Sequence, residues 1–346
     1  MNLLSIREAT TVAQLKSLHD SLPEAVARDI VGKPVMQVFS TLSEFHRAMF
    51  KKALYLADNL VGRQCSLARV PRFAFVMLGS GARSEQSIKS DQDHALIYDG
   101  INPEAQWQGY FEELTKLTSA MLHEIGYPLC TGNVMASNTR WRGTETQWQE
   151  RLARYNEYPD WDHIRFLLIA SDAEIICGDK RLVERLRGQA IQYIARSPFM
   201  RWKVADQGLS AKVALNVLGS IKTEILGDHR GALQIKEGLY TPLVNSVRLW
   251  ALSVGIEDPT TWNRIDRLVS NKAWNDELAE DAKQALLTTL ELRLKHHIQM
   301  ALLGRSIDDY VEVESLSDGE REKLKRALRV VRQIQQLTAR HFPKSG

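Results

Sequence analysis

The sequence predicts an α+β (mixed α/β) fold: a small mixed sheet flanked by helices, preceded by N-terminal helices and followed by an all-helical domain. Three observations predict this arrangement. Apolar residues have helical spacing over residues 1–70, strand-length apolar runs alternate with helical segments over 71–184, and helical spacing returns over 185–346. The chain has 346 residues, of which 44% are hydrophobic and 25% charged. This balance is typical of globular proteins, and the length favours two domains after the helical lead-in.

The N-terminal segment contains the stretch VMQVFSTLSEFHRAMFKKALYLADNLV. Its apolar residues recur every three or four positions from Val38 to Leu60. Such a stripe predicts a helix with one face directed at a core.

The middle segment changes from helical spacing to short apolar runs. FAFVML follows Pro71, and HALIY occupies 94–98, so each predicts a strand. Residues 107–125 predict a helix that ends at Gly126, and residues 130–144 predict an ordered loop or a short strand. A third strand is predicted within RFLLIASDAEIICGD. Strands and helices that alternate in this way predict a small mixed sheet.

The C-terminal segment reads as helical throughout. Helical spacing covers 207–226, 239–254, 262–270, 276–303 and 318–341, and glycines interrupt it between these ranges. We therefore expect a second, all-helical domain.

Charge and targeting signals limit the partners. The 45 Lys and Arg against 42 Asp and Glu give a formal charge of +3, too weak for electrostatics to argue for a specific nucleic-acid partner. No run reaches the ~18–20 apolar residues of a membrane span, so no membrane partner is expected. The N-terminus lacks the order of a secretion signal, so cytoplasmic residence is the default expectation. Cys65, Cys130 and Cys177 are widely spaced and predict neither a disulfide framework nor a zinc site.

The stretch FVMLGSGARSEQSIKSDQDHALIYDG carries two aspartates one residue apart, Asp91 and Asp93. Alternate residues of a strand point to the same face, about 7 Å apart at the Cα atoms. Two neighbouring carboxylates repel each other, and a divalent cation relieves the repulsion. Oxygen ligands favour Mg²⁺, or Mn²⁺, over zinc, and the phosphates of a bound nucleoside triphosphate would share the ions.

Gly79 and Ser80 lie between the preceding strand and a segment that can form a short helix. A tight turn with exposed amide donors suits a triphosphate, and the Ser80 hydroxyl can add a contact. Arg83 and Lys89 follow in the same segment and could neutralise phosphate charge. The stretch thus predicts a site for a metal ion and a nucleotide.

Two other interpretations of the stretch remain open. Paired aspartates are often only two solvated residues at the start of a strand. GSGARS also nearly matches the dinucleotide fingerprint G-x-G-x-x-G, and Asp99 follows about twenty residues later. That oxidoreductase interpretation is weakened because residues 79–91 are too few for the crossover helix of a parallel βαβ unit.

The spacing from Gly79-Ser80 to Asp91-Gln92-Asp93 resembles the signature of the DNA polymerase β-like nucleotidyltransferase superfamily. GSGARSEQSIKSDQDHALIY more closely resembles the GlnD-like nucleotidyltransferases, a domain-of-unknown-function family, and more distantly the uridylyltransferase of bacterial nitrogen signalling. CTGNVMASNTRWRGTETQW and SDAEIICGD are similar to later parts of that family. LQIKEGLYTPLVNSVRLWAL and LELRLKHHIQ are similar to its C-terminal substrate-binding domain. The resemblance covers the chain from about residue 35 onward.

This resemblance implies roles for individual residues. Asp91 and Asp93 would hold the metal ions, and Asp172 would be a third catalytic ligand that helps to deprotonate an acceptor hydroxyl. Two positions depart from the pattern. Gln92 is polar where the superfamily usually has an apolar residue, and Glu174 stands where the family usually has arginine. Glu174 either replaces or disturbs Asp172 as the third carboxylate.

The resemblance therefore implies transfer of a nucleoside monophosphate from a nucleoside triphosphate to a hydroxyl on a protein or a small molecule, with release of pyrophosphate. A regulatory protein is one candidate acceptor. The alternative is a catalytically idle protein that senses nucleotides or acts as a scaffold in signal transduction. Arg140-Trp141 lies in a loop that could border the base or the acceptor.

Overall fold

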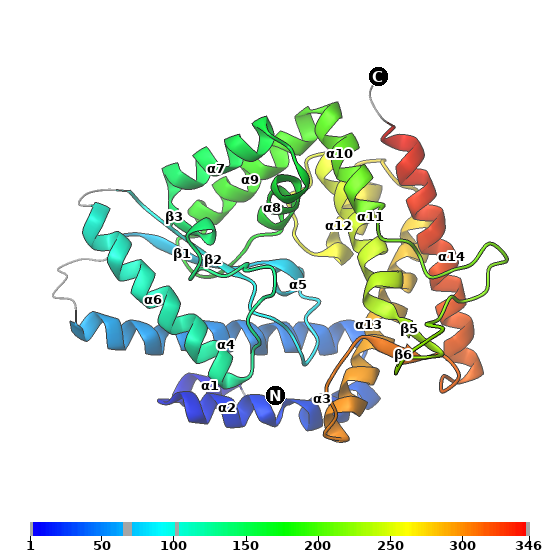
Figure 1. Cartoon of the computed structure of the whole chain (residues 1–346), viewed down its shortest axis with the longest axis horizontal. Coiled ribbons are helices and arrows are strands. Elements are labelled where there is room, and N and C mark those ends of the chain that lie inside the picture. Colours follow the sequence, from blue (N-terminus) through cyan, green and yellow to red (C-terminus); the bar gives the residue numbers. More distant parts are fainter. Residues whose placement is uncertain (1–2, 65–70, 101–103, 344–346) are drawn as a thin grey trace. The chain divides into compact units, whose positions relative to one another are not determined.

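The computed structural model describes residues 3–64, 71–100 and 104–343, and it divides into two compact units (Figure 1). The first unit comprises residues 1–158 and 165–190, and the second comprises 159–164 and 191–346. Cys65 and the end of the predicted helical segment, residues 65–70, lie outside the described residues.

Four helices open the first unit: α1 (Leu3–Glu8), α2 (Val12–Asp20), α3 (Leu22–Gly32) and α4 (Val35–Gln64). The predicted apolar stripe of α4 is confirmed, because Val38, Leu42 and Met49 are fully buried. α4 packs against α6 (Glu104–Ile125) and against strand β4 (Glu174–Gly178). The N-terminal helices therefore belong to the same unit as the sheet.

The first unit is built around a four-stranded mixed sheet with the order β3-β2-β1-β4. β1 (Phe73–Met77) runs antiparallel to both β2 (His94–Tyr98) and β4, and β3 (Arg142–Thr144) runs parallel to β2. The two predicted strands are confirmed as β1 and β2. Met77 lies opposite His94 on one side and opposite Glu174 on the other, so the end of β1 meets the starts of β2 and β4 at one edge.

Helices α7 (Glu145–Glu157), α8 (Trp161–Ser171) and α9 (Lys180–Arg196) complete the mixed α/β region, and α8 and α9 each cross the boundary between the two units. The third strand predicted within residues 165–179 is confirmed as β4, which ends at Gly178. The first half of this range is the end of α8, and only Glu174–Gly178 forms a strand. Phe166, Leu167 and Ala170 are buried in helical geometry, and a short apolar run cannot by itself distinguish a buried helix from a buried strand.

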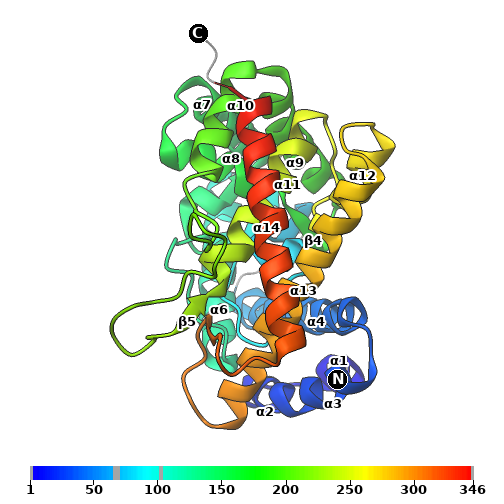
Figure 2. The same cartoon turned by 90° about the vertical axis from the view of Figure 1, so that its right-hand side faces the viewer.

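The second unit is mainly helical (Figure 2). It contains α10 (Pro198–Gly208), a π-helical turn η2 (Lys236–Tyr240), α11 (Thr241–Ser253), α12 (Thr261–Ser270), α13 (Asp276–Leu302) and α14 (Asp318–His341). α14 packs along α13 and α11. The all-helical prediction was wrong in one respect, because β5 (Ala232–Gln234) pairs antiparallel with β6 (Tyr310–Glu312).

The predicted helix over 207–226 does not form. α10 ends at Gly208, and the following segment turns at Gly219 and Gly227, whose φ angles are both +80°. Val217 and Leu218 are almost completely exposed, so their helical spacing does not come from a buried face.

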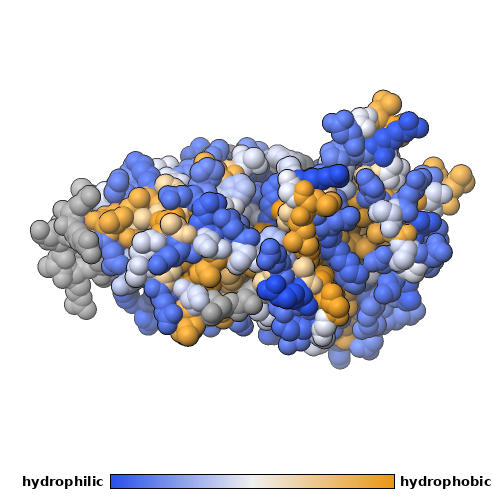
Figure 3. Space-filling model, turned by 90° about the horizontal axis from the view of Figure 1, so that it is seen from below, coloured by the Kyte–Doolittle hydropathy of each residue, from blue (hydrophilic) through white to orange (hydrophobic). Residues whose placement is uncertain are grey.

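Figure 3 shows one face of the molecule, on which apolar patches are interspersed in a mainly hydrophilic surface. No helix of the described residues has the length and apolar character needed to cross a bilayer.

Candidate functional site

The Gly79-Ser80 turn lies at the end of β1, at the edge where β2 and β4 begin. Leu78 is extended, Gly79 has a φ angle of +57°, and residues Gly79–Ala82 form the single helical turn α5. A Cβ atom on Gly79 would lie only 2.4 Å from Oδ2 of Asp93. The Asp93 carboxylate therefore packs directly against the glycine Cα, and a side chain at residue 79 would displace it.

Asp91 and Asp93 come directly before β2, and Gln92 holds them in place from between. The Gln92 side chain is fully buried, and its amide donates hydrogen bonds to the backbone oxygens of Ser119 and Tyr127, at 3.0 and 2.9 Å. Asp91 and Asp93 are both half-buried. In this extended segment the residues on either side of an inward-pointing side chain point outward, so the two carboxylates share a face. The polar Gln92 thus acts as an anchor for the pair.

Buried histidines fix the segments around the two aspartates. His94 Nδ1 accepts a hydrogen bond from the backbone N–H of Ala136 at 3.1 Å, so the ring proton lies on Nε2, which faces Gln92 Oε1 at 3.4 Å. His46 bridges the backbone oxygen of Ser87 and the hydroxyl of Tyr127. Burial lowers the pKa of both His46 and His94 to about 3, so both rings are neutral near pH 7.

Cys130 contacts Asp93 from the loop that follows α6. Burial, and then the negative charge of Asp93, raise the pKa of the Cys130 thiol to about 12. The protonated thiol hydrogen-bonds with the Asp93 carboxylate. In the sequence Cys130 is only an isolated cysteine, because residues that meet through the fold leave no spacing signal.

Arg83 does not lie where a phosphate contact was predicted. Its side chain is only 7% exposed, and its Nε and Nη1 atoms donate to Glu85 Oε2 at 2.9 Å and Asp172 Oδ2 at 2.7 Å. Two carboxylates thus hold the guanidinium inside the protein. Through these two ion pairs Arg83 connects the turn after α5 with the turn before β4.

Asp172 is also placed differently from the prediction. It lies in the turn between α8 and β4 instead of on a strand, and its side chain is fully buried beside Arg83. Among the described residues no group of three or more His, Cys, Asp or Glu side chains lies close enough to hold a metal ion. Asp91, Asp93 and Asp172 therefore do not form such a group among the described residues.

Glu174 does not replace Asp172. It is the first residue of β4, and its carboxylate pairs with Arg187 at 3.1 Å and with Arg47 at 3.9 Å. Glu174 and His94 both lie opposite Met77, so their side chains share a face of the sheet. Asp93 directly precedes His94 and therefore points to the other face.

The remaining predicted residues lie around the two aspartates. Ser80 is half-buried on α5, and Lys89 is exposed in the segment that leads to Asp91. Two carboxylates on one face fit the chemistry of Mg²⁺, which proteins commonly hold through one or two carboxylates together with substrate phosphates and water. The donor set therefore suits Mg²⁺ or Mn²⁺ without a third protein ligand.

Two protein-family models match the chain. Residues 20–162 match the family described as "Putative nucleotidyltransferase DUF294". Residues 198–342 match the family described as "Putative nucleotidyltransferase substrate binding domain". The chain belongs to this nucleotidyltransferase family. Comparison with curated proteins gives no match.

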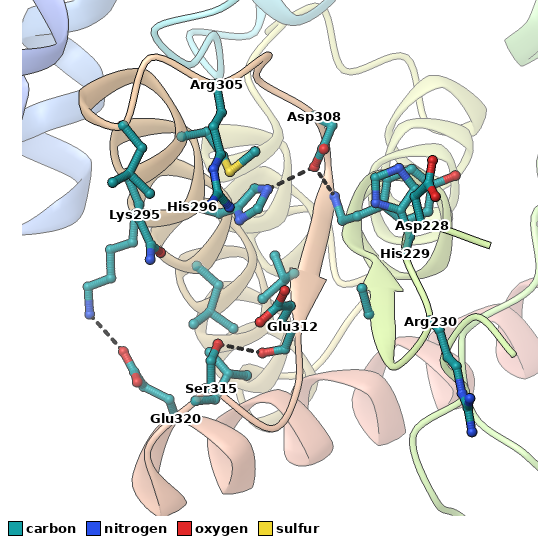
Figure 4. Close-up of a pocket in the computed structure, with 18 residues that line it drawn as sticks. Asp228, His229, Arg230, Lys295, His296, Arg305, Asp308, Glu312, Ser315 and Glu320 are labelled. Carbon is teal, nitrogen blue, oxygen red and sulfur yellow. Dashed lines mark hydrogen bonds and ion pairs between the residues drawn. The ribbon is translucent and has the colours of Figure 1, made fainter. Parts of the chain in front are cut away.

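The second match falls within the second unit, which contains a polar cavity of about 430 Å³ (Figure 4). α13, β6 with its flanking segments, and residues 228–232 line the cavity. His296 Nε2 lies 2.9 Å from Asp308 Oδ1, and the His229 ring stacks on Tyr310 with centroids 3.8 Å apart. Known small-molecule sites have volumes of roughly 300–1,000 Å³. The cavity thus has the size and polarity for a small polar molecule or for one side chain.

Proposed function

We propose that the chain is a metal-dependent nucleotidyltransferase that transfers a nucleoside monophosphate from a nucleoside triphosphate to a hydroxyl group. The observation that carries the proposal is the contact of Asp93 with Gly79, beside Asp91 on the same face. This contact places the two carboxylates beside a tight turn whose backbone amides could bind phosphates. The family match supports the same class of activity.

In the proposed reaction the acceptor oxygen attacks the α-phosphorus, the bond from that phosphorus to the bridging oxygen breaks, and pyrophosphate leaves. Asp91 and Asp93 would hold Mg²⁺ or Mn²⁺, which neutralises phosphate charge. Gly79 and Ser80 would contact the triphosphate through the backbone and the hydroxyl. Lys89 would add a cation at the edge of the site. Arg83 and Asp172 would support the turn from inside the protein.

The acceptor is a hydroxyl of a protein or of a small molecule, as in protein uridylyltransferases. We assign recognition of a polar part of this acceptor to the cavity of the second unit, because that unit matches the substrate binding domain. A His296→Ala variant should then bind nucleotides normally and label its acceptor several-fold less. Unchanged labelling would remove the cavity from the reaction. No membrane or specific nucleic-acid partner is proposed, and cytoplasmic residence stays a prediction.

One observation favours a second candidate function, a catalytically idle nucleotide sensor or scaffold. Asp172 is engaged by Arg83, so the described residues offer two metal-binding carboxylates where the resemblance implied three. A sensor needs only to bind the nucleotide, and two carboxylates suffice for that.

Four α-labelled nucleoside triphosphates, incubated with cell extract and Mg²⁺, distinguish the two functions. The wild-type protein should label an acceptor, and an Asp91→Asn, Asp93→Asn double variant should not. Nucleotide binding without label transfer would support the sensor. Equal labelling by both proteins would defeat the catalytic assignment of the two aspartates.

A further inference from the structure

Two arginines of the first unit flank one buried aromatic ring. Phe166 on α8 is 3% exposed. The Cζ atoms of Arg140 and Arg165 lie 4.2 and 5.6 Å from the centroid of its ring. A guanidinium over an aromatic face is held by cation–π attraction, so the ring gathers two positive charges in one place.

The backbone of Arg140 is fixed in this position. Its N–H donates to Asn138 Oδ1 at 3.0 Å, and its carbonyl oxygen accepts from Arg151 Nη1 at 2.9 Å. The Arg140 side chain is exposed, whereas Arg165 is half-buried on α8. One residue thus presents its cation from an anchored loop and the other from a helix.

Neither arginine has an ion pair with a carboxylate in the part of the chain that the structure describes. Arg165 Nη2 donates a hydrogen bond to the Gly132 backbone oxygen at 3.4 Å. Both guanidiniums also contact the face of the Phe166 ring. An anion with several oxygens could accept charge-assisted hydrogen bonds from both guanidiniums. Planar guanidiniums match phosphate oxygens particularly well.

Arg165 is connected toward Asp93 through the loop that carries Cys130 and Gly132. A Cβ atom on Gly132 would lie 2.6 Å from Arg165 Nη2 and 3.6 Å from Cys130 Sγ. Cys130 in turn hydrogen-bonds with Asp93. Arg165 therefore lies one residue contact beyond the thiol that touches Asp93.

We propose that Arg140 and Arg165 bind the β- and γ-phosphates of the nucleoside triphosphate, and hold the pyrophosphate that leaves. The inference rests on the proposed function and names the cations that the predicted Arg83 contact does not supply. Asp91 and Asp93 would hold a metal ion that neutralises phosphate charge, whereas the two arginines would bind the distal phosphates. The pair therefore distinguishes a triphosphate from a monophosphate.

Calorimetric titration of the full-length protein tests the proposal. The probes are inorganic tripolyphosphate and the four ribonucleoside triphosphates, each with Mg²⁺, and the matching monophosphates. Arg140→Gln and Arg165→Gln should each weaken triphosphate binding on the order of tenfold, the loss expected for one charge-assisted contact, and leave monophosphate binding unchanged. Arg28→Gln, an exposed arginine on α3, is the matched control and should bind like wild type.

The outcomes separate this inference from the proposed function. Triphosphate binding that is equal in wild type and in both glutamine variants overturns the arginine assignment and leaves the proposed function standing. Absence of triphosphate binding by the wild-type protein overturns both. Arg140→Lys and Arg165→Lys keep the charge, so they serve if a glutamine variant fails to fold. Each should bind triphosphate more weakly than wild type, because lysine lacks the two-pronged geometry of arginine; wild-type affinity in both would count against the assignment.

Discussion

Replacing Gly79 with alanine tests whether the Asp93 carboxylate depends on a bare Cα atom at the turn. Two effects add in this variant. The φ angle of +57° is unfavourable for a residue with a side chain by roughly 1–2 kcal/mol. The new Cβ would also lie 2.4 Å from Asp93 Oδ2, well short of the ~3.5 Å at which heavy atoms make contact. Moving the carboxylate aside adds about 1–3 kcal/mol, as overpacking usually does.

Gly79→Ala should therefore lower the free energy of unfolding on the order of 2–5 kcal/mol and weaken Mg²⁺-dependent triphosphate binding. Thermal unfolding followed by circular dichroism measures the first effect, and calorimetry measures the second. Gly109→Ala is the matched control. Gly109 is exposed within α6, and no atom lies within 4 Å of a Cβ placed there. This change should stabilise the protein by about 0.5–1 kcal/mol through helix propensity.

The two variants together can refute the reasoning. If Gly79→Ala melts at the wild-type temperature and binds triphosphate with wild-type affinity, the turn does not depend on the glycine. The assignment of the Gly79–Asp93 contact as the centre of the site would then fail. A destabilised Gly79→Ala variant that keeps full metal and nucleotide affinity would show that the contact serves folding alone.

Asp172→Asn should destabilise the protein by about 3–5 kcal/mol, because the change leaves the buried Arg83 charge poorly paired. The stabilisation that Mg²⁺ and a triphosphate produce in thermal unfolding should persist in this variant. Loss of that ligand-induced stabilisation would restore Asp172 as a metal ligand. In the folded protein the pKa of His46 and of His94 is about 3, whereas in the unfolded chain the pKa of each histidine is near 6.5. As the pH falls, the unfolded state therefore takes up protons first, and each histidine should remove about 1.4 kcal/mol of stability per pH unit between these two pKa values. Urea denaturation across pH 6 to 4.5 measures this effect. The free energy of unfolding of His94→Gln should fall less steeply with pH than that of the wild type. An unchanged slope would contradict the neutral, buried state of His94. Gln92→Leu should cost about 2–4 kcal/mol, since it removes the side-chain hydrogen bonds to two buried backbone oxygens, and it should also weaken Mg²⁺ binding. A variant with wild-type stability and metal affinity would remove Gln92 as the anchor of the aspartate pair.

Local patterns determined a large part of the fold and of the site. The apolar stripe of α4 predicted a buried helix face, and the runs FAFVML and HALIY predicted β1 and β2. The alternation around Gln92 placed Asp91 and Asp93 on one face. These features depend on residues that are neighbours in the chain, and periodicity reports neighbours well.

Only the tertiary structure decided which distant side chains meet. The sequence gives no sign that Arg83 would be buried between Glu85 and Asp172, because ion pairs between separate turns have no spacing rule. The same holds for Arg140 and Arg165, which come from a loop and a helix to one ring. Apolar composition also left open where within residues 165–179 the third strand begins, because a short buried helix and a short buried strand share it. The chain therefore encodes its two aspartates locally, whereas the contacts of Arg83, Arg140 and Arg165 are decided by packing.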